Sequence, residues 1–528
     1  MQRPVPTGTF AGLWRRAVAR RASAPFLVWE GVEGVTTEWS YEQFDAVVGE
    51  VAGGLRSRGV AAGSAVHLVL ANSPAFVAVW LACTQLGAWI VPADPRAAAI
   101  EQAAQLRRTR PALTIGSVER AEPHRSGVRT AAELGVEVPS HQIDEADTTL
   151  RELRGPRFEP DTTPRPLDRA AVMFTSGTTS EPKGVVLTQA NYHFAGEVMA
   201  AAAQLGPDDR QLVVLPLFHA NAQYYSVASA ISVGASVALV PAFSASRFAG
   251  QASRLGATHA SLFAAPVRMI LARGQGRVTG GRLRHVWCAQ NLTAAQHGDI
   301  TEVLGCSPRQ LYGMTETLPA VLTRPVLDPT LRSMGVASLG CTVVVWDDER
   351  DAPAAPGVTG SLLVLGRPGY ELFLSYLDDS ASTAAAIRRH EADGSVWFDT
   401  GDRASVDDEG RFYFDGRAGE MLKVAGENVS ALEVEAVLAE HPDVLEVAVV
   451  ATPDPVRDEV PLAYVVLQRG APTAQVTELP SWAASRLAPS KRPHAYRQVA
   501  ELPRTSVGKI RKHLLAQTEV VREVGLDG

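Results

Sequence analysis

Lysine is nearly absent from this chain. Its 528 residues include 50 basic side chains, of which only five are lysines, at Lys183, Lys423, Lys491, Lys509 and Lys512. Arginine supplies the rest of the positive charge. An ammonium group is a compact, strongly hydrated point charge, whereas a guanidinium group is a planar fork. A retained lysine therefore suggests a site that needs a compact charge.

Cysteine is scarce as well, with four residues at Cys83, Cys288, Cys306 and Cys341. They are far apart and form neither a CxxC pair nor the Cys/His spacing of a zinc site. This pattern predicts reduced core thiols in a cytoplasmic protein. An excess of positive charge is also missing, because the formal net charge is −7 and no long block of one sign occurs. A nucleic-acid partner is therefore not expected.

Long uninterrupted apolar runs are missing too. Residues 72–93 and 220–246 carry no charge, but each is broken by a glycine and then a proline. This pattern is typical of a buried helix followed by a buried strand, so we expect no membrane span. Residues 1–29 hold arginines and no acid, which superficially resembles an organelle transit segment. We prefer a short amphipathic helix leading into a strand at residues 25–29.

The overall composition is that of a globular protein, with 46% hydrophobic and 20% charged residues. A chain of this length is too long for one core, so we expect two or more domains. Residues 66–70, 73–86 and 88–91 read as strand, helix and strand, which predicts a parallel sheet. The same alternation returns over residues 211–255. Between them, residues 139–168 are rich in proline, threonine and charge and are interpreted as a surface excursion.

The composition changes near Gly416. Beyond it, a helix is expected from Ser430, which stands at the N-cap, with Glu433 at the capping-box position. Strands near residues 444–450 and 462–468 would complete a small α/β unit. We therefore divide the chain into domains at residues 1–417 and 418–528.

The stretch VMFTSGTTSEPKGVV, residues 172–186, sets glycines, hydroxyls and one lysine between two apolar runs. Backbone N–H groups, hydroxyls and a cation are the groups that bind phosphate. A Walker-type loop would end in Gly-Lys-Ser/Thr, but Pro182 precedes Lys183 and Gly184 follows it. The segment from Thr175 to Gly184, called the phosphate loop below, is therefore of another kind. A Ser/Thr-rich surface turn is the alternative for this run taken alone.

Three more motifs carry candidate chemistry. Residues 312–317, YGMTET, follow a predicted strand, and residues 397–402, WFDTGD, end on a carboxylate that could accept two hydrogen bonds from a diol. Residues 502–510, LPRTSVGKI, place a lysine on a loop. Each motif alone is compatible with an ordinary turn beside a strand.

Together these motifs, which run from about residue 60 to residue 510, resemble the adenylate-forming (AMP-binding) superfamily. That superfamily holds acyl- and aryl-CoA synthetases, peptide-synthetase adenylation domains and luciferases. The resemblance implies an α/β fold with a large N-terminal domain of parallel and mixed sheets and a small mobile C-terminal α/β domain. It also implies an acyl-CoA ligase that uses ATP, Mg²⁺ and coenzyme A: a carboxylic acid becomes an acyl-adenylate with release of pyrophosphate, and a thiol then forms the thioester.

The resemblance also assigns roles to residues. Thr315 would bond the α-phosphate, Glu316 would hold Mg²⁺, and Lys509 would be the catalytic lysine. His219 would stand beside the reacting acid. The remaining nucleotide contacts would be Thr175, Ser176, Gly177, Thr178, Thr179, Lys183, Ala289, Gln290, Asn291, Tyr312, Gly313, Met314, Asp402 and Arg417. The pantetheine channel would use Lys423, Gly426, Glu427 and Asn428.

Two stretches, LKVAGENVSALEVE and PLFHANAQY, look most like the carnitine and crotonobetaine CoA-ligase branch. Amino-acid-activating domains carry an aspartate near the His219 position, and none stands here. The chain departs from the family at residues 287–292, WCAQNL, where a small, glycine-rich loop is usual. The hinge position holds Glu420, where an aspartate is usual, and Gly419 stands where a lysine is common.

The acid itself is not identified, because the pocket width depends on how a few side chains pack: His219, Asn221, Tyr224, Trp287 and Leu318. Two alternatives to the ligase stay open. One is an adenylating enzyme that passes the acyl group to an acyl carrier protein or a separate transferase. The other is a non-catalytic nucleotide-binding homologue. A homodimer also stays open, while the small-molecule carboxylic acid is the expected partner.

Overall fold

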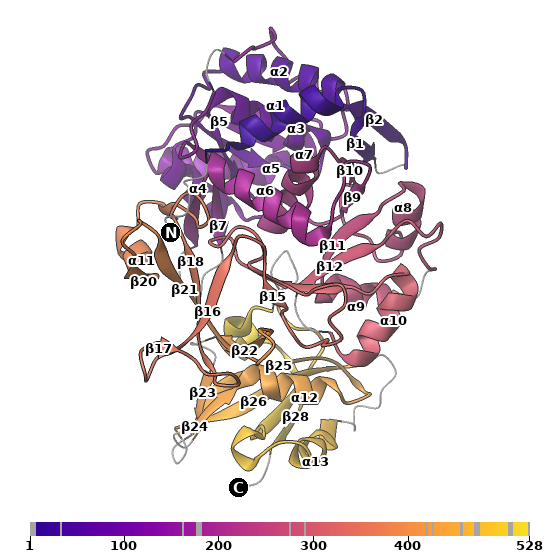
Figure 1. Cartoon of the computed structure of the whole chain (residues 1–528), viewed down its shortest axis with the longest axis vertical. Coiled ribbons are helices and arrows are strands. Elements are labelled where there is room, and N and C mark those ends of the chain that lie inside the picture. The colour runs from indigo at the N-terminus through magenta and orange to yellow at the C-terminus, as the bar shows by residue number, and fades with distance from the viewer. Residues whose placement is uncertain are drawn as a thin grey trace.

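The computed structural model describes residues 7–31, 34–160, 163–175, 182–273, 276–289, 292–417, 421–424, 427–454, 458–468, 476–504 and 510–525. A large N-terminal domain carries three β-sheets, and a small C-terminal domain carries a fourth (Figure 1). The C-terminal domain lies at the end of the long axis opposite to the first helices of the chain (Figure 1). The predicted α/β fold class is confirmed.

The first sheet, called the large sheet, is parallel in its centre and antiparallel at both edges. Its strands are β1 (Pro25–Glu30), β2 (Thr36–Ser40), β9 (Arg210–Val213), β10 (Ser236–Leu239), β11 (His259–Phe263), β12 (His285–Ala289), β13 (Arg309–Tyr312), β14 (Leu322–Thr323) and β15 (Val336–Ala337). They are ordered β15-β14-β13-β12-β11-β9-β10-β1-β2. The parallel pairing predicted from the strand and helix alternation is therefore confirmed.

The second sheet is also mixed. Its strands are β3 (Ala65–Val69), β4 (Trp89–Pro92), β5 (Leu113–Ser117), β6 (Ser140–Ile143), β7 (Arg169–Thr175), β8 (Lys183–Thr188) and β19 (Ser375–Tyr376). Their order is β19-β8-β7-β4-β3-β5-β6. The strands from β7 to β6 run parallel, whereas β8 is antiparallel to both β7 and β19.

The third sheet is antiparallel and completes the large domain. It comprises β16 (Thr342–Asp347), β17 (Ala352–Pro353), β18 (Gly360–Gly366), β20 (Ile387–His390), β21 (Val396–Val406) and β22 (Phe412–Arg417). The C-terminal sheet comprises β23 (Met421–Val424), β24 (Glu427–Ser430), β25 (Val444–Asp454), β26 (Asp458–Leu467), β27 (Ala495–Val499) and β28 (Val520–Gly525). In that sheet β26 and β27 are parallel.

Helices cover the faces of these sheets. In the large domain they are α1 (Phe10–Arg21), α2 (Tyr41–Ser57), α3 (Pro74–Leu86), α4 (Ala99–Thr109), α5 (Ala121–Glu133), α6 (Gln189–Ala203), the π-helical η2 (Asn221–Ala228), α7 (Ser229–Val233), α8 (Phe248–Arg254), α9 (Ala264–Arg273), α10 (Ala294–Leu304) and α11 (Ser380–Ala385). The small domain has α12 (Ala431–Ala439) and α13 (Leu479–Ala484). Short 3₁₀ turns occur at η1 (Val118–Arg120), η5 (Pro489–Lys491) and η6 (Lys512–Gln517).

A layer of helices packs between the large sheet and the second sheet. Helix α6 contacts β7 and β8 of the second sheet and also η2 and α7, and η2 contacts β9 and β11 of the large sheet. Helix α1 packs on α2, α3, α6 and α7. Its predicted amphipathic character is confirmed, since Phe10, Leu13 and Trp14 are buried and the Thr9 side chain caps its first turn. In the described part of the chain, no helix combines the length and apolar character needed to cross a membrane.

Two predictions from the sequence are corrected. Residues 139–168 are not only a surface excursion, because β6 pairs with β5 in the second sheet. Its sequence, SHQI, has no apolar run that would predict a strand, and it forms at the edge of the sheet. The capping box at α12 is half formed: the Ser430 hydroxyl accepts from the Glu433 N–H at 3.4 Å, while the Glu433 carboxylate accepts from Lys491 Nζ at 2.7 Å.

A buried imidazole pair lies between β3, β5 and α5. The Thr114 hydroxyl contacts His67 Nδ1 at 2.9 Å and His124 Nε2 at 2.8 Å, and the two rings are about 0% and 1% exposed. Burial lowers the pKa of His67 to about 4 and that of His124 to about 4. Both rings are therefore neutral in the folded protein at pH 7.

We expect stability to fall as the pH drops from 6.5 towards 4, because the unfolded chain binds protons there that the buried rings reject. At pH 5 the loss should be roughly 2 kcal/mol per ring. Urea unfolding at pH 7 and pH 5 measures it. His124→Gln should show a smaller difference between the two pH values than the wild type. Equal pH dependence in the two proteins would show that His124 titrates normally.

Candidate functional site

The carboxyl edges of the large sheet and the second sheet are joined by one side chain, Asn72, just after β3. Its amide donates to the carbonyl oxygens of Leu215 at 3.0 Å and Val240 at 3.1 Å, beyond the ends of β9 and β10. Its oxygen accepts from the Leu217 N–H at 2.7 Å. Asn72 is 4% exposed. Because ligands of open α/β sheets bind at the carboxyl ends of strands, this junction sets the position of the candidate site.

The segment after β9 is held from a second side. Gln223 on η2 donates to the Leu217 carbonyl oxygen at 2.6 Å and accepts from the Tyr192 hydroxyl at 2.5 Å. Between these anchors His219 is partly exposed, and its ring lies 4.4 Å from the ring of Phe218. His219, which the family resemblance assigns beside the reacting acid, thus lies on a segment whose backbone is held by hydrogen bonds at Leu217.

The phosphate loop is the connection of a β-hairpin. Strands β7 and β8 are antiparallel, with Thr175 opposite Lys183, so its two arms are held together. The predicted contacts Ser176, Gly177, Thr178 and Thr179 lie outside the described residues. Arg108 of α4 supports the second arm by donating to the Pro182 carbonyl oxygen at 2.6 Å, and its guanidinium lies 5.0 Å from the ring centre of Phe174.

A chain of contacts runs from the phosphate loop to the predicted metal ligand. Lys183 Nζ lies 4.7 Å from the ring centre of Tyr376, a cation–π distance. The Tyr376 hydroxyl donates to Glu316 Oε1 at 3.0 Å. Glu316 is 5% exposed, and its backbone oxygen accepts from the Phe373 N–H at 2.8 Å. The structure therefore places Lys183 over the ring of one tyrosine and Glu316 at its hydroxyl.

A second buried carboxylate lies at the other end of the 312–316 loop. Asp402, which is 4% exposed, accepts from the Tyr312 hydroxyl at 2.5 Å and from Arg417 Nε at 2.9 Å. Burial and the neighbouring Asp402 carboxylate raise the pKa of Tyr312. Asp402 and Arg417 pair across β21 and β22. The structure thus brings together Tyr312, Asp402 and Arg417, all of which were predicted as nucleotide contacts.

The loop between these carboxylates is tightly built. A Cβ on Gly313 would lie 2.8 Å from the Pro319 carbonyl oxygen and 3.0 Å from the Tyr225 hydroxyl, so only glycine fits without a shift. The Thr317 hydroxyl accepts from the Met314 N–H at 3.1 Å. Leu318 is fully buried with φ of 68°, a conformation that is rare for a bulky residue and is found where the surroundings impose it. Thr315 is partly exposed within this loop.

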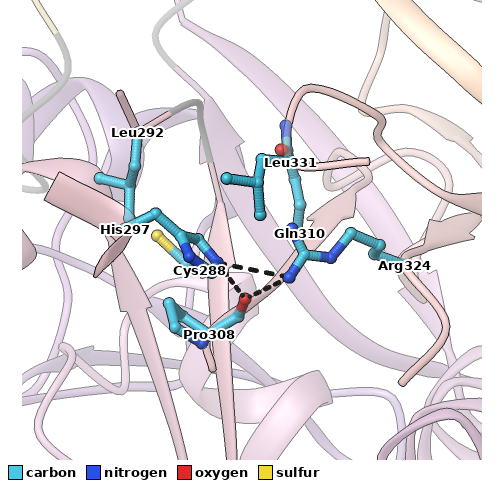
Figure 2. Close-up of a pocket in the computed structure, with 7 residues that line it drawn as sticks. All are labelled: Cys288, Leu292, His297, Pro308, Gln310, Arg324 and Leu331. Atoms are coloured by element: carbon cyan, nitrogen blue, oxygen red, sulfur yellow. Dashed lines mark hydrogen bonds between the residues drawn. The ribbon is translucent and has the colours of Figure 1, made fainter. Parts of the chain in front are cut away.

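The segment 287–292, which departs from the usual family sequence, begins inside β12. Trp287 and Ala289 alternate with Cys288, so they point to the other face of the sheet. A cavity of about 10 Å³ lies on the Cys288 side, between His297, Gln310 and Arg324 (Figure 2). This volume is at the lower limit for a single water, so the cavity cannot hold a substrate. Gln290 and Asn291 lie outside the described residues.

A larger hollow of about 440 Å³ lies at the opposite edge of the large sheet. It is lined by Asp209, Thr258 and Arg284, each of which directly precedes a strand, so it lies at the amino ends. Arg284 and Asp209 form an ion pair there at 2.6 Å. Its position opposite to the carboxyl ends separates it from the candidate site.

The C-terminal part of the prediction is described only in places. Gly426 and Lys509 lie outside the described residues, and nothing is described of the side chains of Lys423, Glu427 and Asn428. Two other lysines form ion pairs with α12: Lys491 with Glu433 at 2.7 Å and Lys512 with Glu435 at 2.8 Å. Rarity alone therefore does not mark a lysine as catalytic.

Sequence reasoning missed three residues that support the site, namely Asn72, Arg108 and Tyr376. Asn72 was seen only as the start of an apolar run. Arg108 lies in an amphipathic helix, and Tyr376 lies in a two-residue strand too short for a periodic pattern. Their contacts join residues that are distant in the sequence, so no local pattern could reveal them.

Comparison with known proteins extends these observations. Residues 14–377 match the AMP-binding enzyme family, and residues 433–509 match the AMP-binding enzyme C-terminal domain. A crotonobetaine/carnitine–CoA ligase of Escherichia coli is 32% identical over 501 residues, covering 92% of this chain and 95% of that protein. The crystal structure of the anthranilate CoA ligase AuaEII in complex with anthranoyl-AMP has a TM-score of 0.87 at 25% identity, covering 97% of this chain and 98% of that one. ATP-bound MatB from Rhodopseudomonas palustris has a TM-score of 0.84 at 24% identity, covering 96% and 98%.

We expect Asn72→Ala to destabilise the large domain by about 2–4 kcal/mol, because two carbonyl groups and one N–H lose their buried partner. Chemical denaturation followed by tryptophan fluorescence measures the loss. Gln517→Ala, which removes an exposed amide, serves as the control and should unfold like the wild type. Wild-type stability in Asn72→Ala would show that the two sheets are joined by packing alone.

Proposed function

The chain belongs to the AMP-binding enzyme family, and we propose that it is an ATP-dependent acyl-CoA ligase. In the first half-reaction a carboxylate attacks the α-phosphorus of ATP, which forms an acyl-adenylate and releases pyrophosphate. In the second, the thiol of coenzyme A attacks the acyl carbon, which forms the thioester and releases AMP. The carboxylic acid is a small molecule.

One observation carries this proposal. The 312–316 loop contacts the Asp402 carboxylate through Tyr312 at one end and reaches Lys183 through Glu316 and Tyr376 at the other. An acceptor for a sugar diol and a cation for phosphate therefore stand at the two ends of one short loop. This order of groups fits a nucleotide laid along the loop, with its ribose at Asp402 and its phosphates at the hairpin.

We assign the nucleotide contacts accordingly. Asp402 accepts hydrogen bonds from the ribose, since the two oxygens of a carboxylate can accept in parallel from a diol. The Tyr312 ring stacks on adenine, with Gly313, Met314 and Ala289 beside it. Thr315 donates to the α-phosphate. Thr175 to Thr179 and Lys183 surround the other phosphates.

A magnesium ion fits the donor set in the same loop. Glu316 supplies a buried carboxylate, and the hydrogen bond that it accepts from the Tyr376 hydroxyl fixes its orientation. In the described part of the chain, no group of three or more His, Cys, Asp and Glu side chains could hold a metal. This is compatible with Mg²⁺, which keeps several waters and shares phosphate oxygens with one or two carboxylates. When bound, the ion neutralises charge on the phosphates.

The small domain delivers the remaining groups. We place the domain boundary between Arg417, the end of β22, and residue 418. We propose that Lys509 stabilises the charge that develops as pyrophosphate leaves. A rotation about Glu420 then brings Gly426 to Asn428, with Lys423, towards the adenylate for thiol attack.

Other features stay part of the proposal. We propose a cytoplasmic location, and His219 is assigned beside the reacting carboxylate. An acyl carrier protein in place of coenzyme A and a homodimer are the alternatives that experiment must separate.

Pyrophosphate release across a panel of carboxylic acids, with and without coenzyme A, tests the whole assignment. Release that yields acyl-AMP but never acyl-CoA at saturating coenzyme A would favour the carrier-protein alternative. Nucleotide binding without release would favour a non-catalytic homologue.

We expect Lys509→Ala to lose adenylation by at least 100-fold while it still forms thioester from supplied acyl-adenylate, because the lysine acts only in the first transition state. The matched control is Lys512→Ala, which removes a lysine that is ion-paired with Glu435 and should adenylate like the wild type. The two half-reactions are measured separately by pyrophosphate release and thioester yield. Equal loss of both steps in Lys509→Ala would contradict the assignment.

Glu316→Gln should raise the Mg²⁺ concentration for half-maximal turnover at least tenfold, because it removes the charge that partners the ion. Tyr376→Phe keeps that charge and loses only one hydrogen bond, so its shift should be clearly smaller. Carboxylate binding should change little in either variant. Pyrophosphate release over a Mg²⁺ titration is the measurement, and an unchanged titration in Glu316→Gln would remove Glu316 from the metal site.

A further inference from the structure

Asn221 is a buried amide with no partner. It is 6% exposed and opens η2, yet neither its Nδ2 nor its Oδ1 has a hydrogen-bond partner among the described residues. Buried polar side chains are nearly always paired, so an amide with both groups unpaired needs an explanation. A ligand that donates and accepts hydrogen bonds is one such explanation.

The two other buried amides that hold this segment of the chain are both paired. Asn72 and Gln223, the two buried amides that hold the same segment, both use their nitrogen and their oxygen. The backbone at Leu217, just before η2, is therefore held by both amides. Asn221 lacks partners within a segment whose other amides are satisfied, which separates it from a loosely packed surface residue.

The position of Asn221 points to the acyl site. Tyr225 stands one turn further along η2, and its hydroxyl lies 3.0 Å from where a Cβ of Gly313 would be. Gly313 belongs to the loop that carries Tyr312 and Glu316. Asn221 also follows His219 by two residues. Asn221 thus belongs to the segment beyond the carboxyl end of β9, and the helix that it opens reaches the loop assigned to the nucleotide through Tyr225.

Further unpaired polar groups face the same layer. Gln211 of β9 donates to the Tyr225 carbonyl oxygen at 3.4 Å, so its face of the sheet is covered by η2. The strand register places Ser261 of β11 and Trp287 of β12 side by side on that face. Within the described residues, Ser261 Oγ and Trp287 Nε1 are also buried without partners. The layer therefore contains hydrogen-bonding groups beyond Asn221.

The strands and the π-helix of this layer carry no acidic side chain of their own. The sequences of β9, β11, β12, β13 and η2, all of which are described, include neither aspartate nor glutamate. Two carboxylates reach it from outside: Asp209 lies 4.0 Å from His259 at the amino ends of the strands, and Glu316, assigned to the metal, adds to burial in raising the pKa of Tyr224.

The ring of Trp287 cannot hold a quaternary ammonium group, because the Arg309 guanidinium lies 5.1 Å from its centre and the His285 ring lies 4.2 Å away at a right angle. A positively charged acyl chain would meet a like charge at Arg309.

We propose that Asn221 recognises a neutral polar group, a hydroxyl or a carboxamide, on the chain of the acid that is activated. This rests on the proposed acyl-CoA ligase function. Such a group can accept from Asn221 Nδ2 and donate to its Oδ1, so it satisfies both ends of the amide. A plain aliphatic acid would leave the amide unpaired, and a quaternary ammonium acid such as carnitine would not be matched by charge.

The first test measures kcat/KM for pyrophosphate release with matched pairs of acids, for example 4-hydroxybenzoate with benzoate and 3-hydroxybutyrate with butyrate, and with carnitine. In at least one pair the wild type should prefer the hydroxylated member at least tenfold, since a site built around a hydroxyl rejects the analogue that lacks it. In Asn221→Leu that preference should fall below threefold, because leucine offers no hydrogen bond to the hydroxyl. Equal preference in both proteins, or carnitine as the best acid, would overturn the proposal.

The second test does not depend on activity. Without ligand, Asn221→Leu should raise the thermal unfolding midpoint, because it removes a buried amide that has no partner. Gln223→Leu is the matched control and should lower the midpoint, since that amide is fully paired. A lowered or unchanged midpoint in Asn221→Leu would overturn the proposal by showing a structural role. If no acid releases pyrophosphate, the ligase function fails, and the midpoint still decides whether Asn221 is held open for a ligand.

Discussion

The hydrogen bonds of Asn72 are the constraint on which the rest of this site depends. The large sheet and the second sheet are separated by a layer of helices, and their described strands share no backbone hydrogen bonds. Their relative position must therefore come from side-chain contacts. Asn72 follows a strand of one sheet and binds the backbone beyond two strands of the other. A small buried amide is suited to this, because it offers a donor and an acceptor in a fixed geometry. The segments that carry the phosphate loop and His219 are thereby held in one frame.

Much of the fold and part of the site could be predicted from the sequence. Strands β1, β3 and β4 and helix α3 lie within a few residues of their predicted bounds, because each has a clear apolar pattern or a cap. The motifs assigned Tyr312 and Asp402 separately to the nucleotide, and the structure adds a hydrogen bond between their side chains. Tyr376 and Arg108 escaped, since their contacts bridge positions far apart in the chain. β6 escaped because its sequence is polar.

The lysines show where a compositional argument stops. A residue type that is rare in a chain does draw attention to its few positions, and Lys183 does stand beside the hairpin and Tyr376. Yet Lys491 and Lys512 form ion pairs with α12, in the same small domain that contains the LPRTSVGKI segment. What distinguishes Lys183 is its surroundings, an aromatic face and a hairpin end, and these are properties of the fold.

Arg417 connects the proposed ribose site to the end of β22. It is the last residue of β22, the strand that ends where the small domain begins, and its guanidinium is bound to Asp402 on the neighbouring strand. A ligand hydroxyl that binds Asp402 therefore either competes with Arg417 for this carboxylate or binds it together with Arg417, the residue just before the proposed small domain. In the proposed function this carboxylate also binds the ribose, so nucleotide binding and the placement of Arg417 depend on one side chain.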